Sequence, residues 1–161
     1  MSNFDVNKVG KRMALEALRL QGHEVVIKYN HTFIGNHPLM MWTKTHQDRV
    51  VGNGKHKVTG KDQDQMELIE KNVKEFGDVW LVFIDALWGL IMGGPYSELM
   101  KPKEFEGQMW PYTEITAHGK IIYFNLYLLP DIGKISEEDL KELKDAIILN
   151  RTPKGQGLLL F

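Results

Sequence analysis

The sequence predicts an α/β protein in which helices flank a mixed β-sheet, and three observations support this. Three segments repeat apolar residues every three or four positions, the spacing of amphipathic helices. Val79–Ile84 is continuously apolar, as expected of a strand covered on both faces. Asn53-Gly54 separates two short β-prone segments and predicts a hairpin turn. We expect one domain over residues 1–150, followed by a tail over residues 151–161 that docks on the domain or on a partner.

The helical segments carry recognisable start and stop signals. Gly22 and Gly77 each follow an apolar stripe, where a helix commonly ends in a residue with positive φ. Ser136 with Asp139 three residues later forms a start signal that resembles a capping box. The predicted helices run from about Asp5 to Gln21, from about Asp62 to Phe76, and from Glu137 to Leu149.

The remaining segments are interpreted as strands and turns around Val79–Ile84, which we expect at the centre of the sheet. Glu24–Tyr29 is short and β-branched and predicts a strand, and Asn30–Thr45 is interpreted as a long excursion into a strand. The later elements are a neighbour of the central strand at Leu87–Met92, a short helical turn at Pro95–Met100, and a second hairpin formed by Thr113–Ala117 and Lys120–Leu128.

Composition excludes several classes of protein. The chain is 43% apolar and 25% charged with a formal net charge of -1, so a strongly basic nucleic-acid protein is excluded and any basic surface must be local. The absence of cysteine excludes disulfides, thiolate metal sites and cysteine nucleophiles. Residues 1–11 lack an apolar signal core, and Asp85 and Gly89 interrupt the longest apolar runs. We therefore expect a cytoplasmic protein with no membrane partner.

The order of helix, strand, hairpin, helix and buried strand resembles the restriction-endonuclease-like fold of the PD-(D/E)XK nucleases, and most closely the archaeal Holliday-junction resolvases. Three pieces in the first half of the chain carry the resemblance. They are the opening helix closed by Gly22 before Glu24-Val25-Val26, the segment from Asp48 to Lys55, and the helix that ends at Phe76-Gly77 before the apolar strand.

The resemblance implies metal-assisted hydrolysis of phosphodiester bonds. In that family, an acid at the end of one strand and a carboxylate-x-lysine on the next bind Mg²⁺, and the lysine helps to orient or activate water. The first acid falls on Asp48. No Asp or Glu stands two residues before a lysine in His56–Lys61, although Lys57 or Lys61 can replace the lysine. The catalytic residues implied are therefore Asp48, Lys57 and Lys61.

Three explanations of the missing carboxylate stay open. Asp62 and Asp64 can join Asp48 as magnesium ligands, although acids at the start of a helix also cap it and favour its dipole. Asp85, at the end of the buried strand, is a further ligand candidate, although Asp is also a common turn residue. In the third explanation, the site is lost and the fold serves as a binding module.

Two small basic groups are candidates for contacts with DNA phosphates. Lys11 and Arg12 lie on the opening helix, and Arg49 and Lys55 lie on the predicted hairpin. Lysine and arginine neutralise the DNA backbone without reading its sequence. A simpler interpretation is a solvated surface balanced by the acids of the last helix.

The histidines suggest a rival metal site. His31, His37, His46 and His56 fall within 26 residues, and imidazole and carboxylate groups bind Zn²⁺. No His-x-x-x-His or other zinc-binding spacing is present, so scattered polar histidines are the simpler interpretation.

Two function classes remain. The first is a divalent-metal-dependent DNA endonuclease, and the second is an inactive nuclease-fold module that binds DNA or protein, of the kind found in phages, mobile elements or defence loci. A homodimer is expected, with subunit contacts through an exposed Trp110 region and Leu158–Phe161. Both classes require the Asn53-Gly54 hairpin to present Asp48 at the rim of the sheet that contains Val79–Ile84.

Overall fold

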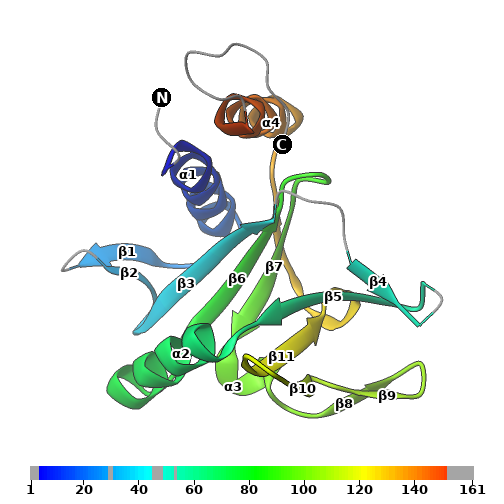
Figure 1. Cartoon of the computed structure of the whole chain (residues 1–161). Coiled ribbons are helices and arrows are strands. Elements are labelled where there is room, and N and C mark those ends of the chain that lie inside the picture. Colours follow the sequence, from blue (N-terminus) through cyan, green and yellow to red (C-terminus); the bar gives the residue numbers. More distant parts are fainter. Residues whose placement is uncertain (1–3, 29–30, 45–48, 53, 152–161) are drawn as a thin grey trace.

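The computed structural model describes residues 4–28, 31–44, 49–52 and 54–151 (Figure 1). The helices in these ranges are α1 (Phe4–Leu20), α2 (Gln63–Phe76), α3 (Tyr96–Leu99), α4 (Glu137–Arg151) and the 3-10 helix η1 (Leu126–Leu128). The strands are β1 (Val25–Lys28), β2 (His31–Ile34), β3 (His37–Lys44), β4 (Arg49–Val51), β5 (His56–Lys61), β6 (Trp80–Asp85), β7 (Leu90–Pro95), β8 (Lys103–Phe105), β9 (Gln108–Trp110), β10 (Tyr112–Thr116), β11 (Gly119–Asn125) and β12 (Asp131–Lys134).

The main sheet has six strands in the order β1-β2-β3-β6-β7-β12. Strands β3 and β6 run parallel, with Leu39 paired with Trp80 and Lys44 with Asp85, and the other described pairs of this sheet are antiparallel. A parallel pair requires a long crossover connection. Here the crossover holds β4, β5 and α2, so these elements leave the main sheet before the chain returns to it.

The central position predicted for Val79–Ile84 is confirmed. Strand β6 lies between β3 and β7 and is buried along almost its whole length. Because side chains alternate along a strand, Val82 and Ile84 pack with α1 and α4, while Leu81 and Phe83 pack with α2 and β11. The continuous apolar pattern therefore reflects cover on both faces.

The hairpin expected around Asn53-Gly54 forms, but it lies in a different sheet from the one expected. Strands β4 and β5 pair antiparallel and belong to a four-stranded sheet in the order β10-β11-β5-β4. Strand β5 pairs with β11, with Val58 opposite Asn125. The expectation that this hairpin forms the rim of the β6 sheet is therefore wrong. The turn signal defines the hairpin but not the sheet that it joins.

Other predicted elements are confirmed or corrected by the structure. The neighbour of the central strand, the short helical turn and the second hairpin are β7, α3 and β10–β11. The excursion expected over Asn30–Thr45 is instead two paired strands, β2 and β3, joined at the Gly35-Asn36 turn. The β8–β9 hairpin and β12 were not predicted. The C-terminal tail, including Leu158–Phe161, lies outside the described residues.

Gly93 in β7 permits close contact between β7 and β6. Its φ is +146°, and a Cβ atom built on it would lie 1.9 Å from the backbone oxygen of Leu81. No side chain fits at that distance, so the position requires glycine. A Cβ on the next residue, Gly94, would meet only the Leu99 side chain at 3.7 Å, an ordinary contact.

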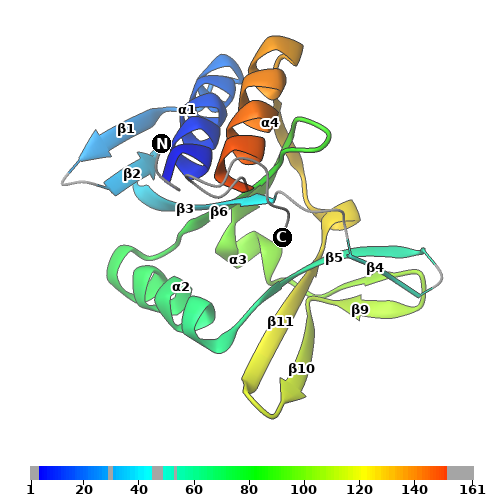
Figure 2. The ribbon, with the colours of Figure 1, turned by 45° about the horizontal axis from the view of Figure 1, so that its top comes forward.

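Helices α1 and α4 pack side by side over one face of the main sheet (Figure 2). Leu18 of α1 and Leu143 of α4 are fully buried in the same apolar cluster. At the surface, the Arg12 guanidinium donates to both carboxylate oxygens of Glu142 at 3.1 Å. Ser136 Oγ accepts from the Asp139 amide at 3.2 Å, which confirms the predicted start signal of α4.

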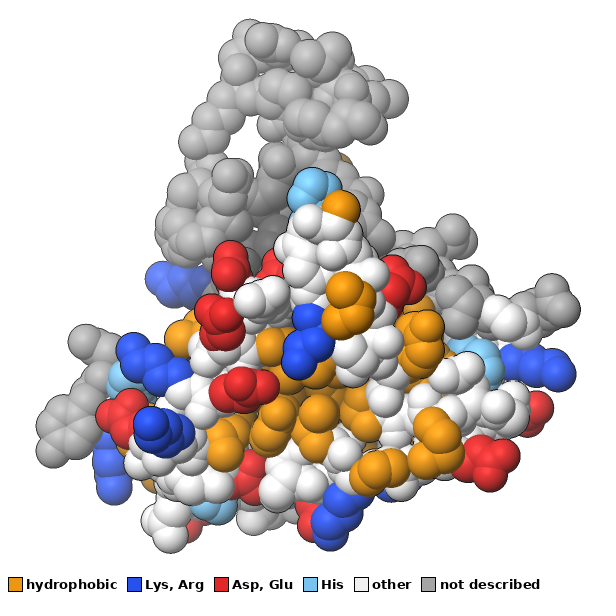
Figure 3. All heavy atoms as spheres, turned by 60° about the horizontal axis from the view of Figure 1, so that its bottom comes forward, with side chains coloured by type: hydrophobic (Ala, Val, Ile, Leu, Met, Phe, Trp, Pro, Cys, Tyr) orange, Lys and Arg blue, Asp and Glu red, His pale blue; other side chains and the backbone are white. Residues whose placement is uncertain are grey.

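The surface carries exposed apolar groups, but Trp110 is not among them. Trp110 itself is only 5% exposed, whereas Met109 and Tyr112 beside it are exposed, so the expected subunit contact through this region stays a prediction. Its indole packs against His56 and against Tyr112, of which Tyr112 is exposed. Seen from the side of α2 and α3, hydrophobic side chains gather at the centre of the face (Figure 3). The homodimer stays a prediction. No helix in the described ranges is long and apolar enough to cross a bilayer.

Candidate functional site: a cavity between the two sheets

A cavity of about 190 Å³ lies where the main sheet meets the four-stranded sheet. Strands β3, β5, β6 and β7 and the 3-10 helix η1 supply its walls, so residues distant in sequence meet there. Most lining side chains are apolar, and the polar ones are two threonines, one lysine and one aspartate. The lining residues are Trp42, Thr43, Thr59, Lys61, Phe83, Ile84, Asp85, Met92 and Leu126.

Side chains alternate along β5, so one face of this strand lies toward the cavity and the other packs near Trp110. Lys57, Thr59 and Lys61 occupy alternate positions and share one face of the strand. Thr59 and Lys61 line the cavity, and Lys57 reaches Asp85 of the main sheet. On the other face, His56 and Val58 are buried next to Trp110.

Asp85 is fully buried at the end of β6 and has two structural roles. Its Oδ1 accepts hydrogen bonds from the backbone amides of Leu87 at 2.9 Å and Trp88 at 3.3 Å, which forms the turn into β7. Its Oδ2 lies 3.5 Å from Lys57 Nζ and has no hydrogen-bond partner. The interpretation of Asp85 as a turn residue is therefore confirmed, and its charge is balanced by Lys57.

Lys61 is the most unusual cation of the site. The residue is only 6% exposed, and its Nζ lies 4.3 Å from the centre of the Trp42 ring and 5.5 Å from that of Phe83. Burial lowers the pKa of the Lys61 ammonium to about 8, although the nearby Asp62 carboxylate opposes this shift. Among the described residues, Lys61 forms no ion pair, and the Trp42 and Phe83 rings together with the nearby Asp62 carboxylate favour its charged form.

Asp62 and Asp64 belong to the start of α2. The Asp62 carboxylate accepts from the Gln65 amide at 2.9 Å, and Gln65 Oε1 accepts from the Asp62 amide at 3.1 Å. This reciprocal pair is a capping box, so the capping interpretation of Asp62 is confirmed. Asp64 is exposed in the first turn, where a negative charge favours the helix dipole.

The described candidates for metal ligands, Asp62, Asp64 and Asp85, do not form a metal-binding group. Asp48 lies outside the described residues. Within the described ranges, no three His, Asp or Glu side chains converge on a point that could hold a metal ion. His56 is buried with Nδ1 3.1 Å from Asn125 Nδ2, and His31 packs against Phe33 and Phe76. These contacts indicate structural roles for both histidines.

The basic residues predicted to contact DNA fall into two separate places. Lys11 and Arg12 are exposed on α1, where Arg12 also lies 3.7 Å from Glu16 in addition to its contact with Glu142. Lys55 is exposed in the turn between β4 and β5, and Arg49 begins β4. Figure 1 shows α1 and the β4–β5 hairpin on different sides of the main sheet.

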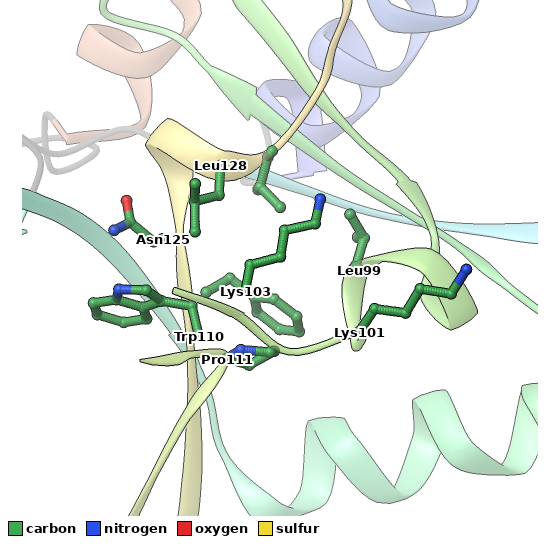
Figure 4. Close-up of a pocket in the computed structure, with 9 residues that line it drawn as sticks. Leu99, Lys101, Lys103, Trp110, Pro111, Asn125 and Leu128 are labelled. Atoms are coloured by element: carbon green, nitrogen blue, oxygen red, sulfur yellow. The ribbon is translucent and has the colours of Figure 1, made fainter. Parts of the chain in front are cut away.

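A second pocket lies beside β9 and β11 but is far smaller (Figure 4). Its volume is about 20 Å³, enough for a single water molecule. Leu99, Pro111 and Leu128 are among its lining residues, and the side chain of Lys101 points away from Trp110. This pocket is too small to be a ligand site as it stands.

No protein-family model, curated protein or solved structure matches this chain. The sequence pointed to Lys61 and Asp85, but it gave no reason to place Trp42, Thr43 or Thr59 beside them. Trp42 ends an apolar run, and only the parallel pairing of β3 with β6 brings it to the cavity.

Proposed function

We propose that this protein is a nucleic-acid-binding module that lacks metal-assisted hydrolysis. Because the β4–β5 hairpin lies outside the main sheet, the proposal keeps from the nuclease resemblance only the order of elements around the crossover. The observation that carries the proposed lack of hydrolysis is the set of residue types in β2 and β3. In the nuclease resemblance, the two strands before the helical crossover supply the acid and the carboxylate-x-lysine. The crossover to β6 starts from β3, so the proposal assigns these two roles to β2 and β3 rather than to β4 and β5.

Neither of these strands contains an acid. Strand β2 reads His-Thr-Phe-Ile, and β3 ends in Trp42-Thr43-Lys44. A lysine thus stands at the lysine position, but tryptophan replaces the carboxylate two residues before it. Mg²⁺ prefers oxygen ligands, and an indole provides none. The nearest buried carboxylate, Asp85, is paired with Lys57.

The β4–β5 hairpin is the best candidate for contact with nucleic acid. Residues 49–61 contain Arg49, Lys55, Lys57 and Lys61 and no Asp or Glu. Lys57 and Lys61 face the cavity region, which leaves Lys55 at the exposed turn and Arg49 as the predicted phosphate contacts. A two-stranded ribbon fits the major groove of B-form DNA.

The test measures binding and cleavage separately. Purified protein is incubated with duplex, branched and single-stranded DNA, with and without Mg²⁺ or Mn²⁺. We expect binding without cleavage. The double variant Arg49→Ala/Lys55→Ala should lower the slope of log affinity against log salt concentration by about 2 on duplex DNA, because each lost phosphate contact removes about 0.9.

A matched control is Lys120→Ala/Lys134→Ala, which removes two lysines that are exposed on other strands. This control should leave the slope unchanged. Equal effects of both double variants would contradict the proposed role of the hairpin. Metal-dependent cleavage that disappears in Asp48→Ala would instead establish the endonuclease class and Asp48 as a metal ligand.

A further inference from the structure

The cavity between the sheets contains a buried lysine that has no salt bridge to a described residue. Lys61 lines the cavity, is almost fully buried, and forms no ion pair with any described residue. Asp85 is the carboxylate among the lining residues, and Lys57 lies 3.5 Å from it. An anion that enters the cavity therefore meets an ammonium group that forms no salt bridge with a described residue.

The size and the walls of the cavity limit the kind of anion. An apolar cavity of about 150 Å³ holds one benzene molecule. The present cavity, at about 190 Å³, has room for a body of one ring together with a small polar group. Phe83, Met92 and Leu126 give it apolar walls, and Thr59 adds a polar side chain, whereas the Thr43 hydroxyl lies on the other face of β3, next to Gly10 of α1.

We propose that this cavity binds a small organic monoanion, namely a carboxylate on a compact apolar body, with Lys61 as the counterion. The site goes beyond the nucleic-acid proposal and does not depend on it. The carboxylate pairs with Lys61, the hydroxyl of Thr59 is available as a second donor, and the apolar body contacts Phe83 and Met92.

Other ligand classes fit the same cavity less well. Inorganic phosphate carries more charge and more acceptor oxygens than one lysine and one threonine can match, and it leaves the apolar walls without a contact. A neutral apolar ligand leaves the Lys61 charge buried and unpaired, which costs free energy. The lowered pKa of Lys61 reflects the same cost, which a bound carboxylate would relieve.

The experiment follows Met92, which lines the cavity, by NMR of protein labelled with ¹³C in the methionine methyl groups. The variant Met92→Leu identifies its signal. Benzoate and hexanoate are the carboxylate probes, benzyl alcohol is the neutral probe of similar shape, and inorganic phosphate and thymidine 5′-monophosphate are the phosphate probes.

We expect benzoate to shift the Met92 signal to saturation, with at least tenfold higher affinity than benzyl alcohol. Lys61→Met should weaken benzoate binding at least tenfold, whereas Lys120→Met, a change at an exposed lysine of β11, should leave it unchanged. Unchanged methionine signals away from the cavity show that each variant is folded.

Three results would overturn the proposal. The first is equal binding of benzoate and benzyl alcohol, which would show a merely apolar cavity. The second is no saturable shift with benzoate up to about 10 mM, a concentration that would largely fill a site with a 1 mM dissociation constant. The third is a response to either phosphate probe without a response to either carboxylate.

Discussion

Lys57 Nζ lies 3.5 Å from Asp85 Oδ2, and this ion pair connects the two sheets. Lys57 belongs to β5 of the four-stranded sheet, and Asp85 ends β6 of the main sheet. Asp85 is fully buried, and the Lys57 side chain is 15% exposed. A buried carboxylate is costly without a counterion, so each partner should be sensitive to loss of the other.

The variant Lys57→Met should lower the free energy of unfolding by about 3 kcal/mol, because it leaves the Asp85 carboxylate buried and uncompensated. Asp85→Asn removes the charge but keeps Oδ1 as acceptor for the amides of Leu87 and Trp88. Urea unfolding of both single variants and the double variant measures the coupling. We expect the double variant to lose about 2 kcal/mol less than the sum of the single losses, and strict additivity would contradict the pair.

The stability of the protein should rise with pH between about 8 and 10.5. The pKa of Lys61 is about 8 in the folded protein and 10.5 in its ordinary state, so between these values the unfolded chain binds more protons than the folded one. The full shift corresponds to about 3 kcal/mol. This gain in the free energy of unfolding is absent below pH 8 and complete above pH 10.5.

The matched comparison is Lys61→Met, which cannot titrate at this position. Relative to the natural protein, this variant should be more stable at pH 7, and the difference should shrink as the pH rises to 10.5. Urea unfolding at a series of pH values measures this difference in the free energy of unfolding. A constant difference across this range would show that Lys61 keeps an ordinary pKa.

Gly93→Ala should lower the free energy of unfolding by at least about 3 kcal/mol, because it combines an unfavourable φ with a clash against Leu81. Its neighbour provides the control. Gly94→Ala adds the same methyl group in ordinary contact distance of Leu99 and should change stability by less than about 1 kcal/mol. Thermal unfolding compares the two, and similar losses would contradict the close approach of β7 to β6.

Asp62→Ala should destabilise the protein by about 1 kcal/mol, since it removes the capping hydrogen bond at the start of α2. Asp64→Ala removes an exposed charge from the first turn, and its effect should stay within about 0.5 kcal/mol. Chemical unfolding measures both. If Mg²⁺ or Mn²⁺ stabilises the natural protein and either substitution removes that effect, these residues are metal ligands as well.

The elements that could be predicted are those with local signals. Asp62 and Gly77 mark the ends of α2, and the apolar run of β6 predicts its burial on both faces. The pairing of β5 with β11 could not be predicted, because Val58 and Asn125 are far apart in sequence and carry no signal of contact. For the same reason, the local turn signal of the β4–β5 hairpin does not indicate which sheet the hairpin joins.

The same reason limited the prediction of the site. Lys61 and Asp85 were named because their residue types suit catalysis, yet their surroundings depend on long-range pairing. The residue that completes the cavity, Trp42, is indistinguishable in the sequence from an ordinary core tryptophan. Asp85 was correctly interpreted as a turn residue because its backbone partners, Leu87 and Trp88, are local.

The packing of α1 against α4 has a consequence for biosynthesis. A ribosome completes α1 early, but Leu18 finds its neighbour Leu143 only after α4 has been made. The part of α1 that packs against α4 therefore stays uncovered until late in translation, although β1 and β3 are available earlier, and such exposed apolar surface makes nascent chains prone to bind chaperones or aggregate. Production of shortened chains that end before α4 should accordingly yield insoluble material.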